Sequence, residues 1–179
     1  MTPKSATERL FRDNILALAR EFPFARSLVN AGRLSKPCSL EALSLQSADD
    51  PELGGAMVPG APAADAPVAD ESGRTGWLLE HLGGDFTLLV LADTPAEMPD
   101  RSALARLEPS PRLCAVSRNG PHDCKSPMLS DPEGLVRARY GGPGAVYLVR
   151  PDQHVAARFR GFDAAAIQRA LLRASGNAA

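Results

Sequence analysis

The sequence predicts an α/β domain, a central mixed β-sheet flanked by helices, preceded by an N-terminal helix and an extended arm. Nearly continuous apolar runs at 86–93 and 113–117 have the length and the β-branched content of buried strands. Two further apolar segments, 146–150 and 155–159, are joined by Pro151-Asp152-Gln153. Proline and aspartate at this position favour a tight turn, so these two segments are predicted to form an antiparallel hairpin.

The first predicted element is an amphipathic helix. Ser5 followed by Glu8 fits a capping box at its start, and Pro23 ends it. Apolar residues recur at helical spacing along one face, namely Phe11, Ile15, Leu18 and Phe22. Either this face is buried in the protein's own core, or it docks on a partner, because an exposed apolar stripe favours association.

An arm is predicted to follow at 47–76. Its Ala-, Pro-, Gly- and Asp-rich composition offers little periodic apolar face for a helix or a strand. A structureless loop of this length is unusual inside a compact domain, so we expect it to separate an N-terminal region, 1–46, from the domain proper, 77–179. Its first acidic residues are interpreted as solvated charges: Asp49, Asp50 and Glu52.

Helical patterns complete the domain. The segment 77–83 is a predicted short helix ended by two glycines, and a second helix is expected at 101–107. A third follows Asp163, a good N-cap, and stops before Gly176. From residue 77 the predicted order is helix, strand, helix, strand, loop, strand, strand, helix. This order resembles the thioredoxin-like fold.

Four stretches of sequence resemble the C-terminal region of FAD-dependent aromatic hydroxylases, the flavoprotein monooxygenases related to phenol hydroxylase and 3-(3-hydroxyphenyl)propionate hydroxylase. They are FARSLVNAGRLS at 24–35, PGAPAADAPV at 59–68, LGGDFTLLVLAD at 82–93 and YLVRPDQHVAARF at 147–159. The resemblance implies a thioredoxin-like accessory or oligomerisation module. It implies FAD and NAD(P)H only for a parent or partner flavoprotein, because this sequence has no G-x-G-x-x-G between a strand and a helix.

A thiol-dependent redox enzyme is the alternative, with Cys124 as the reactive thiol and Cys114 as a resolving partner. Cys124 lies beside His122 and Lys125, which favour a thiolate. The loop after the first strand, where a thioredoxin-like enzyme has its C-x-x-C motif, reads ADTPAEMPD and has no cysteine.

Charge and composition restrict the classes of partner that the sequence predicts. The formal net charge is −1, and no basic run is long enough to indicate nucleic acid or an acidic membrane. We expect no metal site, since the histidines are widely spaced. An odd set of three cysteines and the polar N-terminus predict a cytoplasmic location. Expected partners are a second copy of the chain or a flavoprotein monooxygenase subunit.

Overall fold

A computed structural model of the chain divides into two compact units, residues 1–37 and 38–179, which are described separately. The structure describes residues 5–22, 37–41, 43–53, 55–118 and 127–177. Two segments singled out in the sequence therefore lie outside the described residues. These are 24–35, which carries the first stretch of the hydroxylase resemblance, and the loop that contains Cys124.

The first unit contains the predicted N-terminal helix, α1 (Ala6–Glu21). The capping box is present as expected: the Ser5 hydroxyl accepts a hydrogen bond from the N–H of Glu8, and the Glu8 carboxylate accepts one from the N–H of Ser5. The helix ends at Glu21, and Phe22, its C-cap residue, directly precedes Pro23 in the sequence. No residue of α1 is buried.

The second unit is built on a seven-stranded mixed sheet with the strand order β2-β1-β5-β4-β3-β6-β7. The strands are β1 (Pro67–Ala69), β2 (Thr75–Trp77), β3 (Thr87–Leu91), β4 (Arg112–Ser117), β5 (Met128–Ser130), β6 (Val146–Val149) and β7 (Val155–Phe159). Strands β3, β4 and β5 run parallel, whereas β6 is antiparallel to β3 and β7 is antiparallel to β6. The α/β class and the β6–β7 hairpin are confirmed.

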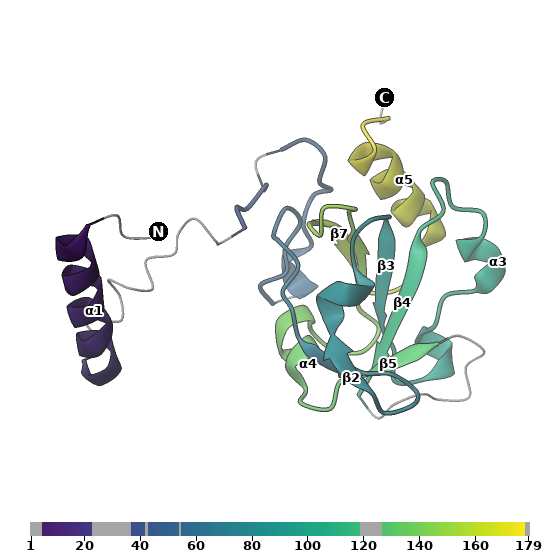
Figure 1. Cartoon of the computed structure of the whole chain (residues 1–179). Helices are drawn as coiled ribbons and strands as arrows, with labels where there is room; N and C mark the ends of the chain where they lie inside the picture. Colours follow the sequence, from purple (N-terminus) through teal and green to yellow (C-terminus); the bar gives the residue numbers. More distant parts are fainter. Residues whose placement is uncertain (1–4, 23–36, 42, 54, 119–126, 178–179) are drawn as a thin grey trace. The chain divides into compact units, whose positions relative to one another are not determined.

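Helices cover one face of this sheet near β3 and β6 (Figure 1). The last helix, α5 (Ala164–Ala174), begins at Asp163, whose carboxylate accepts a hydrogen bond from the N–H of Ala166. Its fully buried Ile167 and Leu171 belong to one apolar cluster with Leu88 of β3. The short α3 (Arg101–Leu104) follows β3 and precedes β4 in the chain. The predicted β-α-β unit is therefore present, although its helix is shorter than the sequence indicates.

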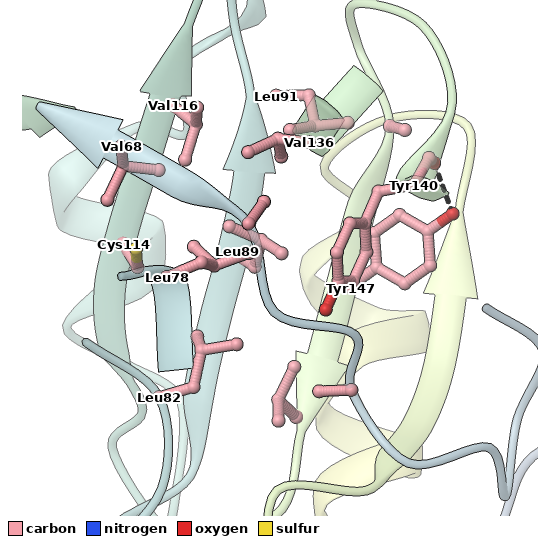
Figure 2. Close-up of a cluster of buried hydrophobic side chains, with 14 of the residues drawn as sticks. Val68, Leu78, Leu82, Leu89, Leu91, Cys114, Val116, Val136, Tyr140 and Tyr147 are labelled. Atoms are coloured by element: carbon pink, nitrogen blue, oxygen red, sulfur yellow. Dashed lines mark hydrogen bonds between the residues drawn. The ribbon is translucent and has the colours of Figure 1, made fainter. Parts of the chain in front are cut away.

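The opposite face is covered by α4 (Leu135–Tyr140) and by a single turn of 3-10 helix, η3 (Leu78–His81). Figure 2 shows this cluster, in which Leu89 of β3 and Cys114 of β4 lie near Leu78. The rings of Tyr140 and Tyr147 meet edge to face with centroids 5.2 Å apart. The hydroxyl of Tyr147 donates to the backbone carbonyl of Tyr140. Both faces of β3 are thus buried, which explains its uninterrupted apolar run.

The predicted arm has more structure than its composition indicates. It supplies η2 (Pro51–Leu53), β1 and β2, and β1 and β2 form an antiparallel pair joined to the sheet by Ala69 opposite Ser130 of β5. Upstream of β1 it runs along the edge strand β7, where the N–H of Gly60 donates to the carbonyl of Val155 at 2.7 Å. The residues of the arm have no periodic apolar face to bury. They are held instead by backbone hydrogen bonds to neighbouring strands of the sheet.

One expectation about a helix was wrong, and one helix was not predicted. The predicted helix at 77–83 is a four-residue 3-10 turn, because Trp77 still belongs to β2. The segment 135–140, which was not assigned, is helix α4. The glycines after α4, Gly141 and Gly144, have φ angles of 98° and 85° and lead into β6. They turn the chain between α4 and β6, in backbone conformations that glycine adopts readily.

Candidate functional site

The carboxyl ends of the parallel strands β3, β4 and β5 lie at one edge of the sheet, the edge at which open α/β sheets usually bind ligands. Asp93 follows β3, Ser117 ends β4 and Asp131 follows β5. The segment after β3 is where a thioredoxin-like redox enzyme would have its thiols. Here it contains Asp93 and continues into η4 (Pro95–Glu97).

Asp93 is the centre of a polar network at this edge. Its Oδ1 accepts hydrogen bonds from the N–H of Arg118 at 3.1 Å and from the Ser117 hydroxyl at 3.5 Å. The same oxygen forms an ion pair with the guanidinium of Arg137, which α4 contributes. The carboxylate of Glu97 accepts from the N–H of Asp93 at 2.7 Å. The loop after β3 is therefore fixed by charge and by backbone hydrogen bonds.

Asp131 holds the other side of this network. It is 2% exposed, and its two carboxylate oxygens accept hydrogen bonds from the N–H groups of Val136 and Arg137 at 3.2 and 3.1 Å. These donors are in the first turn of α4, where N–H groups have no partner within the helix. By satisfying them, Asp131 sets the position of α4 and hence of the Arg137 side chain.

The electrostatics of Asp93 follow from these contacts. Partial burial acts to raise the pKa of Asp93, but the Arg118 N–H and the Arg137 charge outweigh it and hold the pKa below its ordinary value. The carboxylate is therefore ionised and already paired at neutral pH. Such a group is a poor general acid and a weak base, so the geometry favours a structural role for this edge.

Of the two cysteines named for the redox alternative, only Cys114 lies within the described residues. Cys114 lies within β4, facing the apolar cluster with Leu78 and Leu89, and burial raises the pKa of its thiol to about 12. Since the thiolate is the nucleophile, Cys114 is nearly unreactive at neutral pH in this fold. Cys38 is exposed, and Cys124 lies outside the described residues. Within those residues no group of three His, Cys, Asp or Glu side chains is placed to hold a metal ion.

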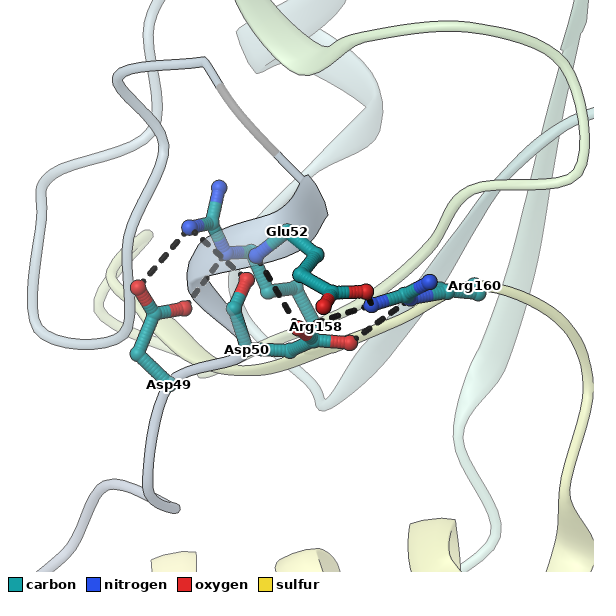
Figure 3. Close-up of polar contacts among 5 residues, drawn as sticks. All are labelled: Asp49, Asp50, Glu52, Arg158 and Arg160. Carbon is teal, nitrogen blue, oxygen red and sulfur yellow. Dashed lines mark hydrogen bonds and ion pairs between the residues drawn. The ribbon is translucent and has the colours of Figure 1, made fainter.

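A second polar site, which the sequence interpretation missed, fastens the arm to β7 (Figure 3). Arg158 is 5% exposed and forms an ion pair with Asp49 at 2.6 Å. Arg160 binds the carboxylate of Asp50 at 2.8 Å and also pairs with Glu52. The interpretation of these three acidic residues as solvated charges was therefore incomplete: each is paired with an arginine, although Glu52 remains 74% exposed. No local pattern indicates these pairs, because the partners lie 108–110 residues apart in the chain.

Within the first unit, the described residues do not cover the apolar face of α1. The four residues named for a partner-facing surface are not buried, with Phe11 at 68%, Leu18 at 44% and Phe22 at 44% exposure. Leu10 adds a further exposed side chain at 66%. The exposed face is consistent with docking.

Among the described residues, no helix is both long and apolar enough to cross a bilayer.

Solved structures with the same fold include two classes of protein. A flavin-dependent monooxygenase, PieE, in complex with FAD and substrate, matches 98% of this chain with 22% identity and a TM-score of 0.61. Aklavinone-11 hydroxylase, in a ternary complex with FAD and aklavinone, matches 74% with 24% identity and a TM-score of 0.55. The thiol peroxidase from Chromobacterium violaceum matches 67% with 18% identity and a TM-score of 0.53. No family model and no curated protein matches the sequence.

These likenesses establish a thioredoxin-like fold. The coverage differs between the two classes, since the chain corresponds to 31% of PieE and 25% of aklavinone-11 hydroxylase but to 89% of the thiol peroxidase. The chain thus spans less than a third of the flavin-dependent monooxygenases that it resembles. The match to PieE extends over nearly the whole chain.

Proposed function

We propose that this chain is a non-catalytic accessory module that docks through α1, either on a flavoprotein monooxygenase subunit or on a second copy of itself. The observation that carries the proposal is the exposed apolar face of α1, which has no buried residue. Apolar side chains on one face of a regular helix gain free energy when a partner removes them from water. The fixed Asp93–Arg137 pair supports the non-catalytic part of the proposal.

The flavin chemistry belongs, in this proposal, to the partner. PieE and aklavinone-11 hydroxylase were solved with FAD, and the chain resembles only a part of each. The proposal gives this chain the task of assembly and leaves FAD and NAD(P)H to the flavoprotein. A visible spectrum tests this division: the purified chain alone should show no flavin absorbance, and near-stoichiometric flavin would contradict it.

The docking surface is tested by replacing Phe11 and Phe22 together with serine. Association, measured as mass in solution by sedimentation and as co-purification with a flavoprotein monooxygenase subunit of the same source, should be lost. The matched control replaces Arg9 and Asp13 with serine, since helical geometry puts these positions on the opposite face of α1, and it should associate like the wild type. A strictly monomeric wild type that binds no flavoprotein subunit would overturn the docking role.

A thiol-dependent redox enzyme is the second candidate, supported by the fold likeness to a thiol peroxidase. In this candidate Cys124 is the attacking thiol. Peroxide and disulfide reduction by the wild type and by Cys124→Ser decide between the two, with Cys38→Ser as the control. Turnover that is lost only with Cys124→Ser would establish the redox enzyme and reject the accessory module.

A further inference from the structure

A hollow of about 520 Å³ is bounded by the turn between β1 and β2, by η3, and by the first residues of β4 and β5. This volume is within the range of small-molecule sites, about 300–1,000 Å³. Apolar side chains of the two strands form one part of its lining, namely Leu113, Cys114, Ala115, Met128 and Leu129. The apolar body of a ligand is removed from water when it packs against these side chains.

The other part of the lining is acidic. Asp70 and Glu71 of the β1–β2 turn and Glu80 of η3 contribute carboxylates. The Ser72 hydroxyl and the N–H of Arg74 donate to Asp70 and hold the pKa of that carboxyl below its ordinary value. The guanidinium of Arg74 also lies 3.3 Å from the Asp70 carboxylate. The charge of Asp70 is therefore compensated within the turn, and Glu71 and Glu80 remain for a ligand.

Glu71 and Glu80 each use one carboxylate oxygen within the protein. Oε1 of Glu71 accepts a hydrogen bond from the N–H of Met128 at 3.3 Å, and Oε2 of Glu80 accepts one from the N–H of Trp77 at 3.3 Å. These bonds fix both side chains at the hollow. The second oxygen of each carboxylate has no partner among the described residues, and both glutamates are exposed, so a ligand can reach them.

The arginine of the lining, Arg112, is directed away from these two carboxylates. Its Nη2 donates to the carbonyls of Gly83 at 2.7 Å and of His81 at 3.5 Å, and its Nε lies 3.7 Å from Asp85. The hollow thus keeps a negative charge, which attracts cations. Within the described parts of the chain no three acidic, histidine or cysteine side chains are placed to hold a metal ion, so an organic cation fits the hollow better.

We propose that this hollow binds a small primary amine, with Glu71 and Glu80 binding the ammonium group and the side chains of β4 and β5 packing against an apolar body. An ammonium group carries a full charge and three N–H donors. Hydrogen bonds between two charged groups are about twice as strong as those between neutral groups. A neutral alcohol of the same shape offers one donor and no charge, so it is a weaker ligand. This inference is independent of docking through α1.

The test is a titration of the full chain with three probes, followed by NMR chemical shifts. 2-Phenylethylamine should bind saturably and shift the backbone amide signals of Cys114 and Met128. 2-Phenylethanol has the same body without the charge, and ethylamine has the charge without the ring, so each should bind at least about tenfold more weakly. A smaller difference from either probe, or no saturable binding of 2-phenylethylamine at millimolar concentration, overturns the proposal.

Variants provide the second readout. Glu71→Gln and Glu80→Gln remove the charges and keep an oxygen that accepts the hydrogen bond from the backbone N–H. The double variant should bind 2-phenylethylamine at least about tenfold more weakly and should bind 2-phenylethanol like the wild type. The control is Glu133→Gln, which changes an exposed carboxylate beyond the opposite end of β5 and should leave both affinities unchanged.

A smaller loss of amine affinity in the folded double variant rejects the site. An equal loss for the alcohol would also reject it, because the effect would then come from an altered fold and not from the lost charge. Should the double variant not fold, the ranking of the three probes on the wild type decides the question alone.

Discussion

Arg158 of β7 donates hydrogen bonds from Nε and Nη2 to the two carboxylate oxygens of Asp49, 109 residues earlier in the chain, at 2.6 and 2.8 Å. The Arg158 side chain is 2% exposed, whereas Asp49 is 34% exposed. Bidentate pairs of this kind fix orientation as well as distance. The pair fastens the arm over the edge strand β7 and so protects an edge that could otherwise pair with another chain.

Asp49→Asn should therefore destabilise the second unit. The substitution removes the charge that compensates a buried guanidinium, and we expect a loss of about 2 kcal/mol in the free energy of unfolding, measured by urea denaturation. The control is Asp13→Asn, which breaks the exposed Arg12–Asp13 pair of α1 and should cost less than about 1 kcal/mol. Equal losses in both variants would show that the arm is not held by this pair.

Lowering the pH should reduce the stabilisation of the fold by the ionised Asp93 carboxylate. The folded pKa of Asp93 lies below the ordinary 3.8, so the unfolded chain takes up the proton first as the pH falls. The stabilisation is then complete above about pH 5 and is lost as the pH falls through the folded pKa. Asp93→Asn should cost about 1–2 kcal/mol at pH 7, with the difference from wild type shrinking towards pH 3.

Urea denaturation at several pH values measures this difference. Asp85→Asn is a suitable control, because Asp85 is 74% exposed and its nearest guanidinium contact, with Arg112, is 3.7 Å. It should behave like the wild type across the whole range. A difference between Asp93→Asn and the wild type that stays constant down to pH 3 would mean that the Asp93 carboxylate is not stabilised in its ionised form.

Cys114 should resist modification until the protein unfolds. With its thiol pKa raised to about 12 by burial, the thiolate fraction is very small at pH 8. In a variant that carries both Cys38→Ser and Cys124→Ser, a disulfide reagent should react with Cys114 only after urea is added. The control is the single variant Cys124→Ser. It retains the exposed Cys38, which should react at once. Rapid labelling of Cys114 without urea would indicate that β4 is open.

Local patterns were sufficient for the elements with strong local signals. The capping pair Ser5 and Glu8 placed the start of α1, and the Pro151-Asp152-Gln153 turn placed the hairpin. The cap at Asp163 placed α5. In each case the residues that determine the structure lie within a few positions of one another, so alternation, helical spacing and turn chemistry describe them directly.

Features that depend on distant partners were missed. Strands β1 and β5 have three residues each and pair with each other. Strand β1 also pairs with β2, and β5 also pairs with β4. Such short strands are stabilised by their neighbours and have no extended pattern of their own. The Arg158–Asp49 pair and the network around Asp93 likewise join segments far apart in the chain. Nothing in the spacing of these residues indicates that they are in contact, because only the folded sheet brings the segments together.

Gly60 provides the last prediction, because the backbone of Leu40 and Glu41 crosses the arm there. Its φ is +92°, and a Cβ at this position would lie 2.5 Å from the backbone Cα of Glu41. Gly60→Ala therefore adds a backbone clash to the strain of a left-handed conformation, and we expect a loss of at least about 3 kcal/mol in urea denaturation. Gly73→Ala is the matched control, since its φ is +82° with no atom within 4 Å of the added Cβ, and it should cost only about 1 kcal/mol. Equal losses at the two positions would mean that the backbone of residue 41 does not approach Gly60 in solution, and the arm would then be free to leave β7.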